Sequence, residues 1–407
     1  MQYKIFGCKL NKFYLNKRLN YFNQTFSDNS DKFLLTTCVV TDRAKTKRLK
    51  EVKQIIKSGK KIYITGCGTL EKGKLIYKSK FYNIYPELKE FKNQIYLLPE
   101  QPKINSSKIK LTKLIPSEKN IYTRKFIVIQ NGCDNFCSFC LTVKKRGNHR
   151  NRPAKEIINE INDFQNSGGK EIILTGVNLA ARGCKDTKKP SQSKFPKLLK
   201  AILTQTKIPR IRISSLGPEY LSDEFFKIIS SKRFLPHFHI SIQSFSDNIL
   251  KSMNRNYNYQ DLSSVISKFK KLKRSDKNQI SIGADIIIGF PGETEGDFTE
   301  TLENVKKFQI TKIHSFPFSK HSKGETVPAS KFKNQVDDKT KKERQKILLN
   351  LTDKIREKFI LRNKNLHHNV LIEGFKDGKW HGRTGNYIQA NLNGDFKRGE
   401  IVSVEKL

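Results

Sequence analysis

The chain has 407 residues and carries 79 Lys and Arg against 38 Asp and Glu, a formal net charge of +41. This length predicts two or three domains, and a hydrophobic content of 36% with 10% aromatic residues excludes a wholly disordered chain. No run of about 18 apolar residues occurs, which excludes a membrane-spanning helix. The first eight residues lack the apolar core of a secretory signal, so we expect a cytoplasmic protein.

The positive charge has two interpretations. A broad positive field attracts polyanions, above all nucleic acid. Most of the excess is Lys in a chain that is also crowded with Asn and Ile, which is the composition that an AT-rich genome produces. Charge alone therefore makes nucleic acid a candidate partner and establishes nothing more.

The N-terminal part contains three short β-rich runs that each end at a cysteine. The runs and their cysteines are residues 5–7 with Cys8, residues 33–37 with Cys38, and residues 62–66 with Cys67. We call these cysteines the N-terminal trio. Because parallel strands gather their carboxyl ends at one edge of a sheet, the trio could converge on a metal cluster. Three buried apolar cysteines would give the same pattern.

A polar Lys/Ser/Pro stretch at residues 101–119 is predicted to be a linker. Beyond it, strands alternate with amphipathic helices, as the helical spacing of Ile157, Ile158, Ile161 and Phe164 illustrates. The six predicted strands are residues 126–130, 171–177, 210–215, 237–243, 280–290 and 312–318. Six such units predict a partial parallel (β/α)6 barrel with its active site at the carboxyl ends of the strands.

The loop after the first of these strands holds a second set of three cysteines, Cys133, Cys137 and Cys140, spaced C-x3-C-x2-C. We call them the loop trio. A total of seven cysteines without a signal peptide argues against a disulfide framework. A closed zinc site needs four ligands, and three thiolates leave one iron of a [4Fe–4S] cluster open. The spacing is typical of radical S-adenosylmethionine (SAM) enzymes, with zinc or chance as the alternative; Cys184 is left without an expected ligand role.

The C-terminal part changes character. Residues 336–362 are predicted to form a strongly charged helix, and residues 369–373, 385–390 and 399–405 to form short alternating strands. This pattern indicates a small β-barrel of OB-like size, an architecture often used to bind oligonucleotides. The alternative is a β cap that merely completes the fold.

Taken in order, these features resemble the radical-SAM methylthiotransferase family over essentially the whole length. Besides both trios, the matching motifs are Gly-Cys-Lys-Leu-Asn (7–11), Thr-Thr-Cys-Val-Val-Thr-Asp-Arg-Ala (36–44), Thr-Gly-Cys (65–67), Leu-Thr-Gly-Val-Asn (174–178), Ser-Ile-Gln-Ser (241–244), Met-Asn-Arg (253–255) and Gly-Phe-Pro-Gly-Glu-Thr-Glu (289–295). The resemblance implies an α/β chain of three domains. These are an auxiliary-cluster domain (1–110), a radical-SAM domain (120–345) and an all-β TRAM domain (360–407).

The resemblance also implies a reaction in which C–H is replaced by C–S–CH3. The N-terminal trio would hold an auxiliary [4Fe–4S] cluster whose sulfur accepts a methyl group from one SAM. The loop trio would hold a second [4Fe–4S] cluster, where another SAM yields the 5′-deoxyadenosyl radical. Residues whose positions suit SAM contacts are Gly176, Asn178, Ser214, Gln243, Arg255, Gly289 and Gly292. The alternative for these residues is ordinary capping of strand and helix ends.

Substrate choice within the family is a finer question. The cysteine motifs look closest to the MtaB-type subgroup, which methylthiolates C2 of N6-threonylcarbamoyladenosine at tRNA position 37. Isopentenyladenosine enzymes usually carry Arg-Glu after the second cysteine motif, where this chain has Thr41-Asp42-Arg43. A third branch modifies a ribosomal-protein aspartate through a recognition domain that tends to be acidic, whereas this tail is basic. A cluster- or zinc-stabilised RNA-binding protein is the non-enzymatic alternative.

The expected partners follow from this assignment. They are a tRNA anticodon stem-loop, an electron donor and a sulfur source, with no membrane and no DNA. Arg383, Lys397 and Arg398 in the tail are the predicted phosphate contacts. Solvated surface charge is the alternative for these three cations.

Overall fold

The computed structural model describes the chain except residues 26–29, 40, 101–121, 275, 277 and 322–324. The predicted linker at 101–119 thus lies outside the described residues. Contacts between residues divide the chain into two compact units. The first unit comprises residues 1–121, 131–150 and 319–330, and the second comprises residues 122–130, 151–318 and 331–407.

The first unit is built on a four-stranded parallel sheet of order β1-β2-β3-β6. Its strands are β1 (Gln2–Ile5), β2 (Lys32–Thr37), β3 (Lys61–Gly66) and β6 (Ile95–Leu97), with a small hairpin of β4 (Leu70–Glu71) and β5 (Lys74–Leu75). Its helices are α1 (Lys9–Thr25), α2 (Asp42–Lys57), α3 (Lys78–Ile84) and α4 (Thr142–Arg146), with 3-10 turns at Cys67–Thr69 and Pro86–Phe91. Leu34, Leu35 and Ile62 are fully buried, as expected for parallel strands covered by helices. The prediction that each cysteine of the N-terminal trio follows a strand is confirmed.

The second unit contains the six predicted barrel strands. They are β7 (Lys125–Val128), β10 (Glu171–Thr175), β11 (Arg210–Ile213), β12 (His237–Gln243), β13 (Ser281–Ile288) and β14 (Lys312–Pro317). They form two parallel sheets, β11-β10-β7 and β12-β13-β14. Leu216 joins the two sheets, because its N–H donates to His239 O (2.8 Å) and its carbonyl accepts from Ser241 N (2.9 Å). Two short strands, β8 (Gln130–Asn131) and β9 (Arg150–Asn151), lie at the unit boundaries.

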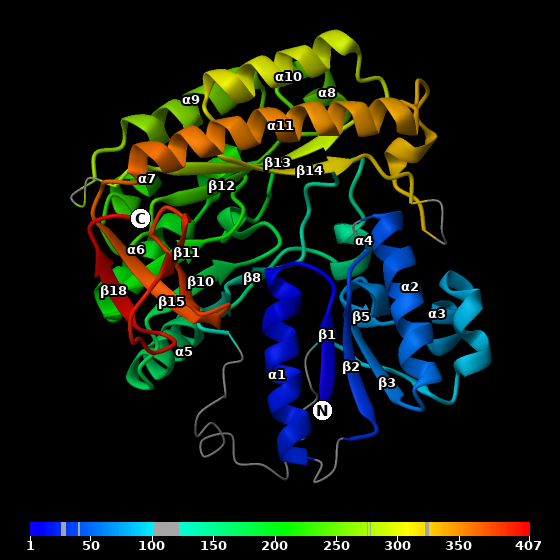
Figure 1. The fold of residues 1–407 in the computed structure, drawn as a ribbon. Helices are drawn as coiled ribbons and strands as arrows, with labels where there is room; N and C mark the ends of the chain where they lie inside the picture. The colour runs from blue at the N-terminus through cyan, green and yellow to red at the C-terminus, as the bar shows by residue number, and fades with distance from the viewer. Residues whose placement is uncertain (26–29, 40, 101–121, 275, 277, 322–324) are drawn as a thin grey trace. The chain divides into compact units, whose positions relative to one another are not determined.

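Helices follow the strands of the second unit in the expected alternation (Figure 1). They are α5 (Ala154–Asn166), α6 (Phe195–Gln205), α7 (Asp223–Ile229), α8 (Asp247–Ser252), α9 (Tyr259–Lys271) and α10 (Glu295–Lys307), with 3-10 turns at Leu179–Ala181, Pro190–Gln192 and Pro218–Tyr220. The 3-10 turn Pro328–Lys331 belongs to the first unit except for its last residue. Ile282, Ala284 and Ile286 of β13 pack into the core that these helices cover. Because strand side chains alternate between faces, Gly283 and Asp285 lie on the opposite, inner face of the sheet.

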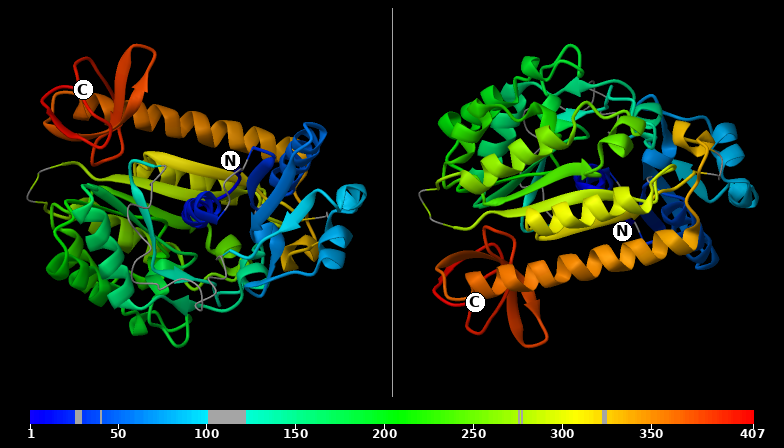
Figure 2. Two further views of the ribbon diagram at one scale, coloured as in Figure 1. Left: turned by 90° about the horizontal axis from the view of Figure 1, so that it is seen from below. Right: turned by 90° about the horizontal axis from the view of Figure 1, so that it is seen from above.

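The charged helix predicted near residues 336–362 is α11 (Asp338–Asn363), which runs beside β14 and leads to the C-terminal sheet (Figure 2). That sheet is antiparallel, of order β17-β16-β15-β18. Its strands are β15 (His368–Lys376), β16 (Lys379–Arg383), β17 (Gln389–Leu392) and β18 (Ile401–Val404). No helix in the described part of the chain is long and apolar enough to cross a membrane.

The C-terminal strands differ from the prediction at two points. The predicted strand at residues 385–390 is wrong over residues 385–388, because the chain turns there and β17 begins at Gln389. Strand β16 was not predicted, since Lys379–Arg383 has few apolar side chains. Asp377 and Gly378 both have positive φ (52° and 73°), the conformation of a tight hairpin turn, and this turn pairs β16 with β15.

Candidate functional site

The N-terminal trio follows three adjacent strands of the first unit. Gly7 and Gly66 precede two of the cysteines with φ of 126° and 93°, and a Cβ on Gly7 would lie 3.2 Å from Cys38 Cβ. Removal from water raises the pKa of the Cys67 thiol to about 12; Arg146 opposes this shift, whereas Cys38 and Cys8 add to it. The three thiols therefore lie within electrostatic reach of one another. This set of three thiols suits an iron–sulfur cluster, because a bound metal keeps a cysteine deprotonated at a pH at which the free thiol would hold its proton.

Two polar side chains fix the loops that carry the N-terminal trio. Asn11 Nδ2 donates to Phe6 O (2.9 Å) and to Thr37 O (3.0 Å). Thr37 Oγ1 donates to Thr65 O (2.8 Å) and accepts from Gly68 N (3.1 Å). Both side chains are buried. The sequence motifs contain Asn11 and Thr37, but nothing in the local pattern assigned them this positioning role.

The loop trio also lies in the first unit. Cys133 N donates to Gly147 O and Cys140 N donates to Cys137 O, both at 3.1 Å. Thr142 N donates to Cys140 Sγ at 3.3 Å, where α4 begins. Gly132 has a φ of 74°, and a Cβ there would lie 1.9 Å from Asn148 O, so only glycine fits. The loop is thus closed against the turn at 147–148, with three sulfurs that could hold one cluster.

Arg146 connects the segments that carry the two trios. Its guanidinium is buried, donates to Asn11 Oδ1 (3.1 Å) and Asn131 Oδ1 (3.3 Å), and pairs with Glu100. Asn131 Nδ2 in turn donates to Tyr14 Oη and to Glu100 Oε2, both at 3.2 Å. The cysteine segments are therefore held by one buried polar network, and sequence reasoning did not single out Arg146.

In the second unit, the predicted SAM residues follow the carboxyl ends of four strands. Gly176 and Asn178 follow β10, where Gln130 Oε1 accepts from Val177 N and Asn178 N at 2.9 Å each. A Cβ on Gly176 would lie 2.9 Å from that same Oε1. Gln130 therefore fixes this turn, a role that its sequence position did not reveal.

The next strand ends bring further predicted residues to this edge. Ser214 Oγ lies 3.4 Å from Thr175 Oγ1, and Gln243 ends β12 with a φ of 68°. Arg255 is drawn to the end of β12 because its Nε donates to Tyr257 Oη (2.9 Å), whose hydroxyl donates to Ile242 O (3.1 Å). These side chains offer polar groups beside one another at the edge where barrel chemistry occurs.

The turn after β13 is shaped by two glycines. Gly289 has a φ of 64°, and a Cβ there would lie 2.4 Å from Lys341 Cγ; Gly292 has a φ of 87° with open space beside it. Gly289 N donates to Glu293 Oε2 (2.8 Å), and Arg344 Nη1 holds the same oxygen (2.7 Å). Burial raises the pKa of Glu293, although both of these bonds oppose it.

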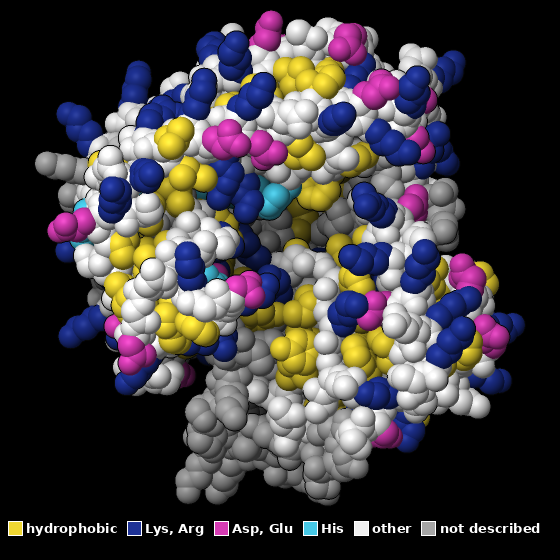
Figure 3. Space-filling view, viewed as in Figure 1, with side chains coloured by type: hydrophobic (Ala, Val, Ile, Leu, Met, Phe, Trp, Pro, Cys, Tyr) yellow, Lys and Arg dark blue, Asp and Glu magenta, His cyan; other side chains and the backbone are white. Residues whose placement is uncertain are grey.

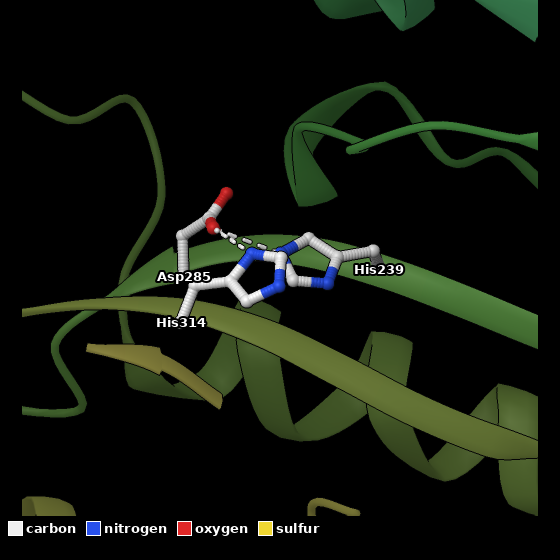
Figure 4. A group of neighbouring side chains, drawn as sticks. All are labelled: His239, Asp285 and His314. Atoms are coloured by element: carbon white, nitrogen blue, oxygen red, sulfur yellow. Dashed lines mark hydrogen bonds and ion pairs between the residues drawn. The ribbon is translucent and has the colours of Figure 1, made fainter. Parts of the chain in front are cut away.

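A further group on the inner face joins three neighbouring strands, with His239 on β12, Asp285 on β13 and His314 on β14 (Figure 4). Asp285 Oδ1 lies 2.9 Å from His239 Nε2 and 3.3 Å from His314 Nδ1. Burial alone would raise the pKa of Asp285, but the two imidazoles hold it well below its usual range. Two imidazoles and a carboxylate could hold a divalent metal ion. Sequence reasoning missed this group, whose only local signal is the alternation of His237 and His239.

The three predicted tail cations do not form one group. Arg383 ends β16, where its Nε lies 3.5 Å from Glu373 Oε2 and its guanidinium 4.8 Å from the Tyr387 ring. Lys397 and Arg398 lie on the exposed connection between β17 and β18, and Arg398 Nε donates to Thr123 Oγ1 (3.0 Å).

Comparison with known proteins agrees with this geometry. Residues 127–305 match the Radical SAM superfamily, and residues 1–84 match the Uncharacterized protein family UPF0004. The threonylcarbamoyladenosine tRNA methylthiotransferase MtaB of Rickettsia prowazekii is 31% identical, over 98% of this chain and 94% of its own. The chain belongs to the radical-SAM methylthiotransferase family. This methylthiotransferase is therefore an enzyme whose cofactors are [4Fe–4S] clusters and SAM.

Other relatives of the methylthiotransferase carry two kinds of name. MtaB of Bacillus subtilis is 30% identical over 98% of this chain and 92% of its own. The tRNA-2-methylthio-N(6)-dimethylallyladenosine synthase of Alkaliphilus oremlandii is also 30% identical, over 98% and 88%. The radical SAM methyltransferase TsrM of Kitasatospora setae shares the fold, with a TM-score of 0.50 at 11% identity over 77% of this chain and 72% of that one. Membership thus gives the reaction class, and the relatives' names do not decide between the two modified adenosines.

Proposed function

We propose that this methylthiotransferase adds a methylthio group to C2 of N6-threonylcarbamoyladenosine at position 37 of tRNA. The observation that carries the proposal is the presence of two cysteine trios within one compact unit. Each trio leaves one iron of a four-iron cluster without a protein ligand. Two such irons match a reaction that needs both SAM cleavage and sulfur delivery.

The residue roles in this proposal follow the two trios. The N-terminal trio holds the auxiliary cluster, and the loop trio holds the cluster that binds SAM. When bound, these groups supply the electron, the sulfur and the methyl group. The chain supplies positions: Asn11 and Thr37 hold the loops of the N-terminal trio, and the closed turn at Gly132 holds the loop trio.

The residues at the strand ends of the second unit would orient SAM. Gln130 Oε1 accepts from Val177 N and Asn178 N and so fixes the turn after β10 that carries Gly176, while Gly289 and Gly292 would allow close approach of backbone to an adenine. Arg255, with Ser214 and Gln243 on neighbouring strands, would bind the carboxylate and ribose. Fixing a substrate in this way contributes to rate by orientation alone.

One feature of the sequence favours the threonylcarbamoyl substrate. The segment after Cys38 reads Thr41-Asp42-Arg43, where isopentenyladenosine enzymes usually carry Arg-Glu. Thr41 Oγ1 caps α2 there by accepting from Ala44 N (3.1 Å). The partners in this proposal are the anticodon stem-loop of the tRNA, an electron donor and a sulfur source. Dimethylallyladenosine at the same tRNA position is the second candidate, because relatives of nearly equal identity carry that name; a ribosomal-protein aspartate is the third.

Nucleoside mass spectrometry of tRNA from a deletion strain tests the substrate. We expect 2-methylthio-N6-threonylcarbamoyladenosine to disappear and its unthiolated precursor to accumulate, with both changes reversed by the wild-type gene. Loss of the dimethylallyl product alone would favour the second candidate. A deletion strain in which both nucleosides persist would contradict the proposal.

A further inference from the structure

One tyrosine of the C-terminal sheet is surrounded by cations from several elements of the second unit. Tyr387 lies between β16 and β17, and its ring centroid is within 6 Å of four cationic groups. The distances are 4.8 Å to Lys312 Nζ, 4.8 Å to Arg383 Cζ, 4.9 Å to Arg212 Cζ and 5.9 Å to Arg124 Cζ. Arg356 on α11 acts electrostatically on Lys312, Arg383 and Tyr387. We call these five cations the Tyr387 cation cluster.

The position of Tyr387 is enforced by its loop. Its φ of 71° is rare for a bulky residue. Thr384 and Asn386, which precede it in the same turn, are buried. Asn386 Nδ2 donates to Asn363 Oδ1 (2.9 Å), and Thr384 Oγ1 accepts from Ile388 N (2.9 Å). The ring also stacks on His237, with centroids 4.7 Å apart. Backbone strain of this kind persists where the surroundings over-determine a residue, and it concentrates at functional sites.

Carboxylates pair with only some of the cations in the Tyr387 cation cluster. Glu171 holds Arg212 (2.7 Å) and lies 3.8 Å from Arg124, and Glu373 pairs with Arg124 and lies 3.5 Å from Arg383. Within the described residues, no carboxylate oxygen lies within 4 Å of Lys312 Nζ or of the Arg356 guanidinium. The fields of exposed Asp353 and of the Tyr387 phenol oppose the effect of Arg383 on Arg356. Burial and neighbouring cations lower the pKa of both Lys312 and Arg356, as expected for cations without a close anion.

The cluster lies apart from the predicted SAM residues. Lys312 is the first residue of β14 and Arg124 directly precedes β7, so both lie at the amino ends of barrel strands. The SAM residues follow the carboxyl ends of strands of the same barrel. Lys312, Arg356 and Arg383 are half-buried, so their charged ends remain within reach of a ligand. Lys and Arg side chains are scattered over much of the described surface seen in Figure 3. The Tyr387 cation cluster differs from these scattered charges because its cations surround one aromatic ring.

We infer that Lys312, Arg356 and Arg383 bind an oxyanion carried by the RNA substrate beside Tyr387. This inference rests on the proposed function for the identity of the substrate. The half-buried cations outnumber the carboxylates near them, which favours binding of an anion that supplies negative charge. The planar guanidinium of Arg can donate two parallel hydrogen bonds to phosphate or carboxylate oxygens. The oxyanion is a backbone phosphate of the RNA, because C2 of the reacting base must lie beside SAM at the carboxyl ends of the strands, and the carboxylate on the same base cannot reach the amino ends from there. Arg124 and Arg212, which carboxylates and backbone carbonyls already hold, position the ring.

The test measures binding of a synthetic anticodon stem-loop RNA to the enzyme loaded with its iron–sulfur clusters. Fluorescence anisotropy gives the affinity over a series of KCl concentrations. The RNA is prepared with and without the threonylcarbamoyl group at position 37. The variant is Lys312→Gln combined with Arg356→Gln. The matched control is Lys342→Gln combined with Lys346→Gln, which removes two exposed charges from α11 outside the cluster. We expect the Lys312/Arg356 variant to bind the RNA roughly tenfold more weakly than wild type, while the affinity of the control changes little. The slope of log K against log salt concentration should be smaller by about one for each lost phosphate contact.

The two RNAs separate the sources of the oxyanion. Equal weakening for both RNAs identifies a backbone phosphate, and weakening only for the modified RNA would overturn the assignment of a phosphate. Wild-type affinity of the Lys312/Arg356 variant for both RNAs, or equal weakening by the control, would overturn the inference. If the double variant does not fold, each single Gln variant carries the same test, because neither touches Glu171 or Glu373. Binding does not depend on turnover, so the inference and the proposed function can fail separately: the first by this measurement, the second by the nucleosides of the deletion strain.

Discussion

Arg146 and Glu100 form a buried ion pair in the first unit, 46 residues apart in sequence. Arg146 ends the helix that follows the loop trio, and Glu100 follows the last strand of the N-terminal sheet. The guanidinium also donates to Asn11, whose amide holds the loops of the N-terminal trio. The pair therefore makes the geometry of one cysteine set depend on the segment that carries the other.

Removing Arg146 should be costly. Arg146→Ala leaves the Glu100 carboxylate buried without its partner, and breaking a buried pair in this way costs about 3–5 kcal/mol of unfolding free energy. Urea unfolding of the full chain measures the loss. Lys144→Ala, an exposed cation two residues earlier, should change stability by less than about 0.5 kcal/mol. Combining Arg146→Ala with Glu100→Gln should recover part of the loss, and strict additivity of the two changes would contradict a direct pair.

The cysteine assignment predicts two separable losses of iron. Anaerobically prepared wild-type protein should hold about eight irons per chain, and Cys38→Ala or Cys137→Ala should each lose about four. Cys137→Ala should abolish SAM cleavage, whereas Cys38→Ala should retain some cleavage but form no methylthio product. Cys184→Ala is the matched control, since Cys184 is buried outside both trios and should keep all the iron. Identical behaviour of the Cys38 and Cys137 variants would argue against separate clusters.

The sequence predicted most of what local patterns determine. Each barrel strand carries apolar side chains in a run or at alternate positions, and the convergence of Cys8, Cys38 and Cys67 follows from parallel topology alone. Strand β16 was missed because pairing with β15, and not its own composition, makes Lys379–Arg383 a strand.

The polar groups that hold the site escaped prediction for a different reason. Arg146 reaches Glu100 and Asn11 through tertiary packing that no local pattern encodes. His314 meets Asp285 only because the register of two strands places them side by side.

The two glycines after β13 form a matched pair for testing local space. Gly289→Ala forces a Cβ to within 2.4 Å of Lys341 Cγ at a positive φ, whereas Gly292→Ala has a positive φ but open space. We expect the second change to cost about 1–2 kcal/mol from backbone strain alone and the first to cost more. Urea unfolding gives the stabilities, and equilibrium dialysis gives the affinity for SAM, which should fall further for the Gly289 variant. Equal effects of both substitutions would mean that the Lys341 side chain moves aside from the new methyl group without loss of unfolding free energy.

Asp285 holds two imidazoles with one carboxylate oxygen. Asp285→Asn keeps the shape but loses the charge, so we expect a loss of about 1–3 kcal/mol in unfolding free energy at neutral pH. Asp377→Asn serves as the control, because the exposed pair of Asp377 with Lys376 (3.4 Å) should contribute less than about 1 kcal/mol. A variant of Asp285 as stable as the control would show that the imidazoles do not need the carboxylate.

The phenol of Tyr387 should titrate unusually early. Burial opposes its ionisation, but Arg124, Arg383, Lys312 and Arg212 outweigh burial and lower its pKa to about 8. Tyrosinate absorbance followed against pH should show one step near that value among the 13 tyrosines, absent in Tyr387→Phe and moved upward in Lys312→Gln.

The same titration predicts a dependence of stability on pH. Because the pKa of Tyr387 is lower in the folded chain than in the unfolded one, the tyrosinate stabilises the fold only above the folded value. The stability of wild-type protein relative to Tyr387→Phe should therefore rise between pH of about 8 and about 10, and this gain should disappear below about 8. Urea unfolding of both proteins across this range measures the difference. A stability difference that does not change with pH would mean that the four cations do not act on the phenol. The cations would then not be concentrated around Tyr387, and the argument for an oxyanion site beside it would fail.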